Sequence, residues 1–125
     1  GGMLLNRWLK EVFHRARPHF DDPLLSLTTY SFPSGHTMTA TVFYGALCIF
    51  LISKVRDLQR RIVIVLATLV LICLVGFSRI YLGVHYLTDV VGAMIEGIAW
   101  LTISFTAFEM IRLRPRNRQD IDESI

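Results

Sequence analysis

Residues 62–77, IVIVLATLVLICLVGF, carry no charge and consist mainly of valine, isoleucine and leucine. A buried strand of a soluble protein can have a similar composition, but this run is too long for a single strand. It is only slightly shorter than the roughly 17 to 25 residues that a helix needs to cross a bilayer. We therefore predict a transmembrane helix here, with ends that extend into the flanking residues.

Two further apolar runs cover residues 37–53 and 90–111, and only Glu96 and Glu109 interrupt the second. The composition of the whole chain agrees with them. Of the 125 residues, 53% are hydrophobic and 18% are charged, and the mean hydropathy is +0.48. This is more apolar than a typical soluble domain. The sequence thus predicts an all-α integral-membrane helical bundle with about three transmembrane helices.

The segment before the first run has the spacing of an amphipathic helix. In residues 4–16, LLNRWLKEVFHRA, apolar side chains recur at helical intervals and charged ones occupy much of the other face. This helix either lies in the membrane interface or is the end of a longer span. Arg17-Pro18 is expected to end it, because a residue before proline is disfavoured in a helix, and residues 19–33 are predicted to be a loop. We set residues 1–3 apart as an artificial addition.

Basic residues bracket the apolar runs. The connector 54–61 and the segment 112–118 carry four basic residues each, so the positive-inside rule places both in the cytoplasm. Residues 119–125 are predicted to be an acidic cytoplasmic tail. Three spans in series then bring the segments around His36 and His85 to the extracytoplasmic side. We interpret the net charge of +3 as a topology signal, since nucleic-acid binding would call for a basic stripe with interleaved aromatic residues.

A cluster of charged residues lies in the segment SRIYLGVHYLTD, residues 78–89. His85 and Asp89 are four residues apart, so on a helix they share one face. A carboxylate beside an imidazole fixes its tautomer and raises the basicity of the far nitrogen. Arg79 adds a forked cation that suits phosphate oxygens. Because charges in apolar surroundings are costly and usually functional, we predict a phosphate site with a histidine nucleophile.

The segment FPSGH, residues 32–36, is a second candidate. Gly35 permits a close backbone approach, Ser34 offers a hydroxyl, and the N–H groups of a helix N-terminus can bind an anion. His36 could protonate a leaving oxygen. An ordinary helix-capping turn with an interfacial histidine explains this segment at least as well.

The third candidate segment contains Lys10 and Arg17-Pro18, with six residues between the two cations. Cations on a helix end and on its exit can converge on a phosphate dianion. The alternative is that these side chains reach out of an amphipathic helix toward lipid headgroups. Taken alone, this segment favours the alternative.

Together the three segments resemble the signature of the type 2 phosphatidic acid phosphatase family, a membrane lipid phosphate phosphatase family that also includes glucose-6-phosphatase and the vanadium haloperoxidases. The signature reads Lys-(six)-Arg-Pro, then Pro-Ser-Gly-His, then Ser-Arg-(five)-His-(three)-Asp. Every position is matched in order and spacing, by Lys10, Arg17, Pro18, Pro33, Ser34, Gly35, His36, Ser78, Arg79, His85 and Asp89. The resemblance implies a membrane phosphatase domain at residues 4–118, with catalytic segments 10–18, 33–36 and 78–89.

The resemblance also implies a role for each residue. His85 would attack phosphorus and carry a phosphohistidine, with Asp89 orienting it. His36 would be the general acid for the leaving group and would then help to activate water. The phosphoryl oxygens would be held by Lys10, Arg17, Ser34, Gly35 and Arg79. No metal and no other cofactor is implied.

The implied substrate is a lipid phosphate or diphosphate of the phosphatidic acid, phosphatidylglycerol phosphate or undecaprenyl diphosphate class. Catalysis is expected at the extracytoplasmic face of a bacterial plasma membrane, among membrane lipids. Members of the family usually have six spans, so we expect either a partial chain or a minimal version that associates with further transmembrane helices or as an oligomer. Two alternatives stay open: a non-catalytic lipid-binding scaffold with the same fold, and a vanadate-dependent haloperoxidase, against which three apolar spans argue.

Overall fold

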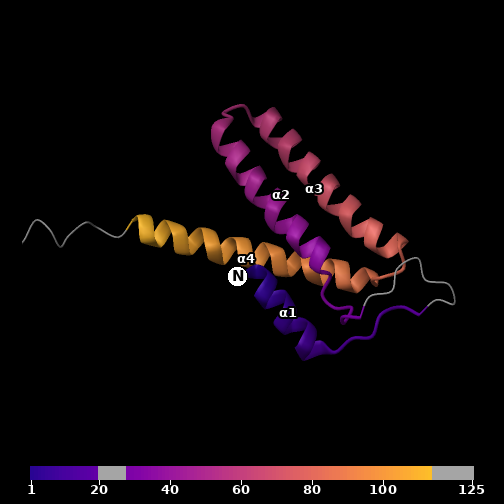
Figure 1. The fold of residues 1–125 in the computed structure, drawn as a ribbon. Coiled ribbons are helices and arrows are strands. Elements are labelled where there is room, and N and C mark those ends of the chain that lie inside the picture. The colour runs from indigo at the N-terminus through magenta and orange to yellow at the C-terminus, as the bar shows by residue number, and fades with distance from the viewer. Residues whose placement is uncertain (20–27, 114–125) are drawn as a thin grey trace, which may run out of the picture.

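A computed structural model describes residues 1–19 and 28–113, which form four α-helices and no strand (Figure 1). The helices are α1 (Gly2–Phe13), α2 (Gly35–Lys54), α3 (Leu58–Tyr81) and α4 (Leu87–Arg112). The last three are each long and apolar enough to cross a membrane, which confirms the predicted all-α bundle with three transmembrane helices. The predicted acidic tail, residues 119–125, lies outside the described residues.

Helix α3 extends four residues beyond its apolar run at each end, as expected for a run that is slightly too short. At its start, the Asp57 carboxylate accepts a hydrogen bond of 3.0 Å from the backbone N–H of Arg60 and caps the helix. At its end, Gly83 takes a left-handed conformation with φ of 68°, which glycine adopts without steric cost. The extension places Ser78 and Arg79 in the last turn of α3, and the Gly83 turn leads the chain from there toward α4.

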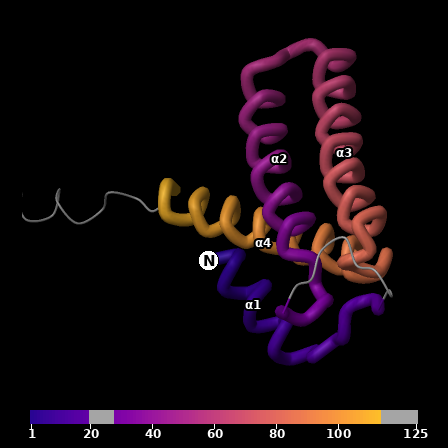
Figure 2. The backbone as a smooth tube through the Cα atoms, turned by 45° about the vertical axis from the view of Figure 1, so that its right-hand side comes forward, coloured from indigo at the N-terminus to yellow at the C-terminus, as the bar shows by residue number. Residues whose placement is uncertain are grey.

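Helices α2 and α3 lie side by side as a hairpin. In both views α4 crosses the open end of this hairpin, opposite the connection between α2 and α3 (Figures 1 and 2). Small side chains allow the close contacts. A Cβ atom added to Gly97 of α4 would lie 2.7 Å from Thr41 of α2, and one on Gly76 of α3 would lie 2.6 Å from Val90. Close approach at glycine is a common way for membrane helices to pack. The outer faces carry exposed apolar side chains, such as Leu66, that suit contact with lipid.

Helix α1 differs at both ends from the predicted helix over residues 4–16. It begins at Gly2, with Gly1 as its N-cap, so the three residues that we set apart as an artificial addition form its start. This start also packs closely on α4, since a Cβ added to Gly1 would clash with Trp100. The helix ends at Phe13, because His14 adopts a left-handed conformation with φ of 45°. The prediction that Arg17-Pro18 ends this helix was therefore wrong by three residues.

The three candidate segments meet at one end of the bundle. The start of α2, the end of α3 and the start of α4 lie close together there, and the chain that follows α1 passes beside them (Figure 2). A direct backbone link joins two of these segments, since the N–H of Ser34 donates to the carbonyl of Asp89 over 3.1 Å. This end of the bundle is the candidate site.

Candidate active site

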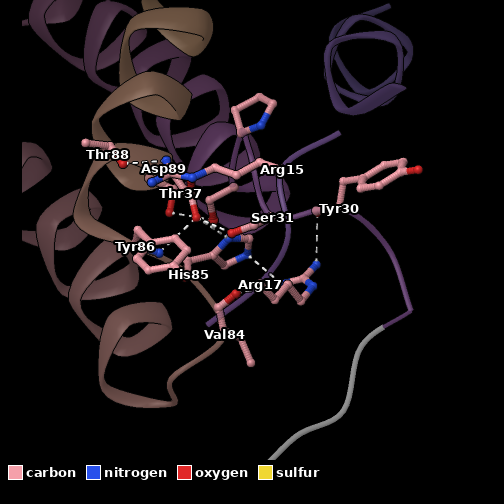
Figure 3. A network of polar contacts seen from close by, with 12 residues as sticks. Arg15, Arg17, Tyr30, Ser31, Thr37, Val84, His85, Tyr86, Thr88 and Asp89 are labelled. Carbon is pink, nitrogen blue, oxygen red and sulfur yellow. Dashed lines mark hydrogen bonds and ion pairs between the residues drawn. The ribbon is translucent and has the colours of Figure 1, made fainter. Parts of the chain in front are cut away.

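The Asp89 carboxylate is the centre of the polar network (Figure 3). It is fully buried in the first turn of α4. Its Oδ1 accepts a hydrogen bond of 2.8 Å from Arg15 Nη1, and its Oδ2 accepts from Ser31 Oγ and, over 2.8 Å, from the backbone N–H of Tyr86. A buried carboxylate is tolerated only when it is paired and hydrogen-bonded. Both oxygens of Asp89 are held in place in this way.

His85 is buried beside this carboxylate, with Nδ1 3.5 Å from Asp89 Oδ2. That distance is too long for a hydrogen bond, and within the described residues Nδ1 has no hydrogen-bond partner. The sequence interpretation, which placed both residues on one helix, was wrong in detail, because α4 begins only at Leu87. The bond from the Tyr86 N–H to Asp89 folds the segment so that the ring and the carboxylate still face each other.

The far nitrogen of His85, Nε2, faces Arg17. Nη1 of Arg17 lies 3.4 Å from it and donates to the Val84 carbonyl over 2.7 Å, while Nε donates to the Thr29 carbonyl over 2.7 Å. Burial, and then repulsion from Arg17, lower the pKa of His85 to about 4, against the opposing effect of Asp89. The imidazole is therefore neutral at neutral pH, the form in which a ring nitrogen can act as a nucleophile.

Lys10 lies close to the same loop. Its Nζ donates to the carbonyls of Tyr30 and Pro33 over 2.9 and 2.7 Å. Burial, and then repulsion from Arg17, lower the pKa of Lys10 to about 8. Burial also lowers the pKa of Arg17, an effect that the charge of Asp89 opposes. Two cations from the segment 10–17 thus surround the loop that leads into α2.

The loop ends at Ser34, which is fully buried and precedes the first residue of α2. The Ser34 side chain does not cap the helix; its Oγ accepts from Thr37 Oγ1 over 3.1 Å. Gly35 and His36 form the first turn of α2, where backbone N–H groups lack partners within the helix and favour an anion.

His36 is exposed and lines an apolar cavity of about 470 Å³ that also contacts Asn6, Gly35, Met38 and Phe43. Arg79, at the end of α3, donates from Nε to Ser78 Oγ over 3.2 Å. Three cations lie close enough to His36 to act on its charge: Arg79, Arg17 and Lys10. Within the described residues, no hydrogen bond joins His36 or Arg79 to His85.

The predicted site residues therefore gather at one end of the bundle, but only some of them are linked by contacts. Contacts link Arg17 to His85, His85 to Asp89, and Asp89 to Ser34, whereas no described hydrogen bond joins His36 or Arg79 to these residues. In residues 1–19 and 28–113, no three side chains of His, Cys, Asp or Glu gather as metal ligands. The arrangement presents a neutral imidazole, a fixed carboxylate and several cations, which is suited to binding and transferring a phosphoryl group.

Comparison with known families agrees with this chemistry. Residues 1–113 match the family model of the PAP2 superfamily. The chain belongs to the PAP2 superfamily. This confirms the family resemblance inferred from the three segments. It also confirms the prediction that the chain is an integral-membrane protein.

Named relatives within the PAP2 superfamily are phosphatases. The chain is 42% identical over 97 residues to phosphatidylglycerophosphatase B of Bacillus subtilis, covering 76% of this chain and 47% of that protein. It is 31% identical over 109 residues to lipid A 1-phosphatase of Rhizobium etli, covering 80% of this chain and 42% of that protein. The crystal structure of a transmembrane PAP2-type phosphatidylglycerolphosphate phosphatase from Bacillus subtilis matches with a TM-score of 0.73 and 37% identity, over 94% of this chain and 57% of that one. The chain spans about half the length of these relatives.

Two residues at the centre of this PAP2 site were not predicted from the sequence. Arg15 donates to Asp89 and also to Thr88 Oγ1 over 2.6 Å, and its guanidinium lies 4.5 Å from the centre of the Tyr86 ring. The sequence interpretation placed it on the polar face of a helix, but α1 ends before it. The only sign of its role in the sequence was its position two residues before Arg17. Ser31, the second residue, carried none.

Arg15→Ala is expected to lower the stability of the PAP2 fold. It removes the cation that faces the buried Asp89 carboxylate, and breaking a buried pair costs about 3–5 kcal/mol. The Arg15 side chain is 38% exposed, so water can replace part of the interaction and we expect about 1–2 kcal/mol. Thermal unfolding in detergent measures this loss. Arg56→Ala, in the exposed connector, is the matched control. Equal unfolding temperatures for the two variants would show that the Arg15–Asp89 pair does not stabilise the fold.

Proposed function

We propose that this chain carries the catalytic centre of a membrane phosphatase that hydrolyses a lipid phosphate or lipid diphosphate through a phosphohistidine intermediate. The observation that carries the proposal is the buried His85 side chain, whose Nδ1 faces the Asp89 carboxylate while Nε2 faces Arg17. The relatives' names support a lipid substrate, since one is a phosphatidylglycerophosphatase and another a lipid A 1-phosphatase.

In the first step, the lone pair of His85 Nε2 forms a bond to phosphorus, and the bond from phosphorus to the lipid oxygen breaks. The leaving oxygen takes a proton from His36. The imidazole becomes cationic as it is phosphorylated, and the Asp89 carboxylate stabilises it at Nδ1. Charge on the phosphoryl oxygens is stabilised by the side chains of Lys10, Arg17 and Arg79 and by backbone N–H groups, as described for other phosphoryl-transfer sites.

In the second step, water attacks the phosphohistidine. His36, now without its proton, takes one from that water, and the bond between phosphorus and Nε2 breaks. Inorganic phosphate leaves and His85 returns to its neutral form. The cations occupy the places that metal ions take in many phosphoryl-transfer enzymes, so the proposed reaction needs no metal.

The proposed location is the extracytoplasmic face of a bacterial plasma membrane. The four basic residues of the connector 54–61 support it, because α2 and α3 place this connector at the opposite end of the hairpin from the candidate site (Figure 1). A site at the end of the spans lets a charged headgroup bind while its acyl or prenyl chains stay in lipid.

A panel of lipid phosphates tests the proposal. The chain in detergent is expected to release inorganic phosphate from phosphatidic acid, phosphatidylglycerol phosphate or undecaprenyl diphosphate, at a rate that EDTA leaves unchanged. Phosphate is measured colorimetrically against a preparation without the chain. Activity that EDTA abolishes and a divalent cation restores would contradict the metal-free reaction. A folded chain that binds these lipids without hydrolysing them would favour the scaffold alternative.

A further inference from the structure

A carboxylate outside the signature lies in the interior of the bundle. Glu96 is in α4, seven residues after Asp89, and is 7% exposed. Its Oε2 accepts a hydrogen bond of 2.8 Å from Asn6 Nδ2, while its Oε1 has no partner among the residues that the structure describes. Asn6 is itself 5% exposed. An ionisable group at such a position within a membrane span is costly and usually has a function.

The Asn6–Glu96 bond joins α1 to α4. In the described part of the chain, no other side-chain hydrogen bond connects these two helices. Lys10 lies four residues after Asn6 on α1, so the two side chains share one helix face. Asn6 also lies close to the start of α2, since it lines the same cavity as Gly35 and a Cβ added to Gly35 would lie 3.4 Å from its Oδ1. Fixing Asn6 therefore fixes where Lys10 meets the loop that leads into α2.

We propose that Asn6 and Glu96 are positioning residues of the phosphate site, which hold α1 against α4 and keep a negative charge facing Lys10. The inference rests on the proposed function, since it assumes that the site binds phosphate. This role explains why α4 carries the buried carboxylate of Glu96, which without a function would only destabilise the bundle.

The charges around Lys10 set the expected pH dependence. Arg17 from the segment after α1 repels its ammonium, while Asp89 and Glu96 from α4 attract it, and the ammonium in turn acts on His36 and His85. Burial and Arg17 bring the pKa of Lys10 to about 8 against the effect of these two carboxylates. Without the charge of Glu96 that pKa falls further. Because the charged form binds phosphate, binding is then lost at a lower pH.

Glu96→Gln tests the inference, because glutamine can still accept the Asn6 hydrogen bond but carries no charge. The probe is inorganic phosphate, and its affinity is measured by calorimetry from pH 6 to 9 with the whole chain in detergent. We expect the loss of affinity at high pH to begin on the order of half a unit to one unit lower than in the parent chain. At pH 8 this corresponds to about a twofold to fivefold weaker affinity. Glu109→Gln, on the same helix, is the matched control and should leave the profile unchanged.

A second comparison separates the charge of Glu96 from a merely structural role. In a Lys10→Arg background the cation stays charged at every pH tested, so adding Glu96→Gln should no longer move the profile. An unshifted profile in the Glu96→Gln single variant, or an equal shift in both backgrounds, would overturn the inference. So would a parent chain that binds no phosphate. A parent chain that binds phosphate with the expected profile but releases none from any lipid would contradict the proposed function and leave the inference standing.

Discussion

His85→Ala is expected to abolish phosphate release from the preferred lipid, with a fall in kcat of at least about three orders of magnitude. The variant lacks the nitrogen that would bond to phosphorus, and no other described nucleophile faces Arg17 at this position. The lipid should still bind, because the cations that hold the phosphate remain. The fold should also persist, since Arg17, which loses its 3.4 Å contact with His85 Nε2, keeps its hydrogen bonds to the Val84 and Thr29 carbonyls.

His19→Ala is the matched control, because His19 is an exposed histidine two residues after Arg17. Substrate labelled in the phosphate group gives a second measurement. The parent chain should retain an acid-labile, alkali-stable label on protein, and His85→Ala should retain none. In the parent chain the rate should fall on the acidic side only as the pH approaches 4, where His85 gains a proton and loses the lone pair. Appreciable turnover by His85→Ala would refute its assignment as the nucleophile.

The transmembrane helices could be predicted from the sequence because the bilayer restricts both composition and length. Their ends depend on local contacts that hydropathy does not report. Helix α3 starts at Leu58 because Asp57 caps it, and α1 ends at Phe13 because His14 turns left-handed. Neither event changes the apolar pattern, so the predicted boundaries of α1 were wrong while the number of spans was correct.

The candidate site could be predicted only where a motif marks it. His85, Asp89 and Arg17 have fixed spacings and were found in this way. Arg15 and Ser31 reach Asp89 across 74 and 58 residues of sequence, and nothing local to either residue indicates that contact. The roles assigned to His85, Asp89 and Arg17 remain predictions, and so do those of His36 and Arg79, which no described hydrogen bond joins to His85.

His36→Ala is expected to slow hydrolysis of a lipid phosphate by about two to four orders of magnitude, the usual contribution of a general acid or base. A lipid alkoxide is a poor leaving group and needs the proton. The nitrophenolate of p-nitrophenyl phosphate does not, so the first step should survive with that substrate. The second step should still be slow, because water lacks its base. The variant should therefore release a burst of about one nitrophenolate per site, followed by slow turnover, while phosphohistidine accumulates.

This burst distinguishes the proposed role of His36 from simpler ones. A residue that only bound phosphate would weaken both substrates alike and give no burst, and His85→Ala should give none either, because it forms no phosphohistidine. His36 is exposed at the start of α2 and lines the apolar cavity, so alanine should leave the packing around Asp89 intact. Stopped-flow measurement of nitrophenolate, with the trapped label counted in parallel, determines the outcome. Equal slowing of both substrates without a burst would remove His36 from proton transfer and leave it a phosphate contact.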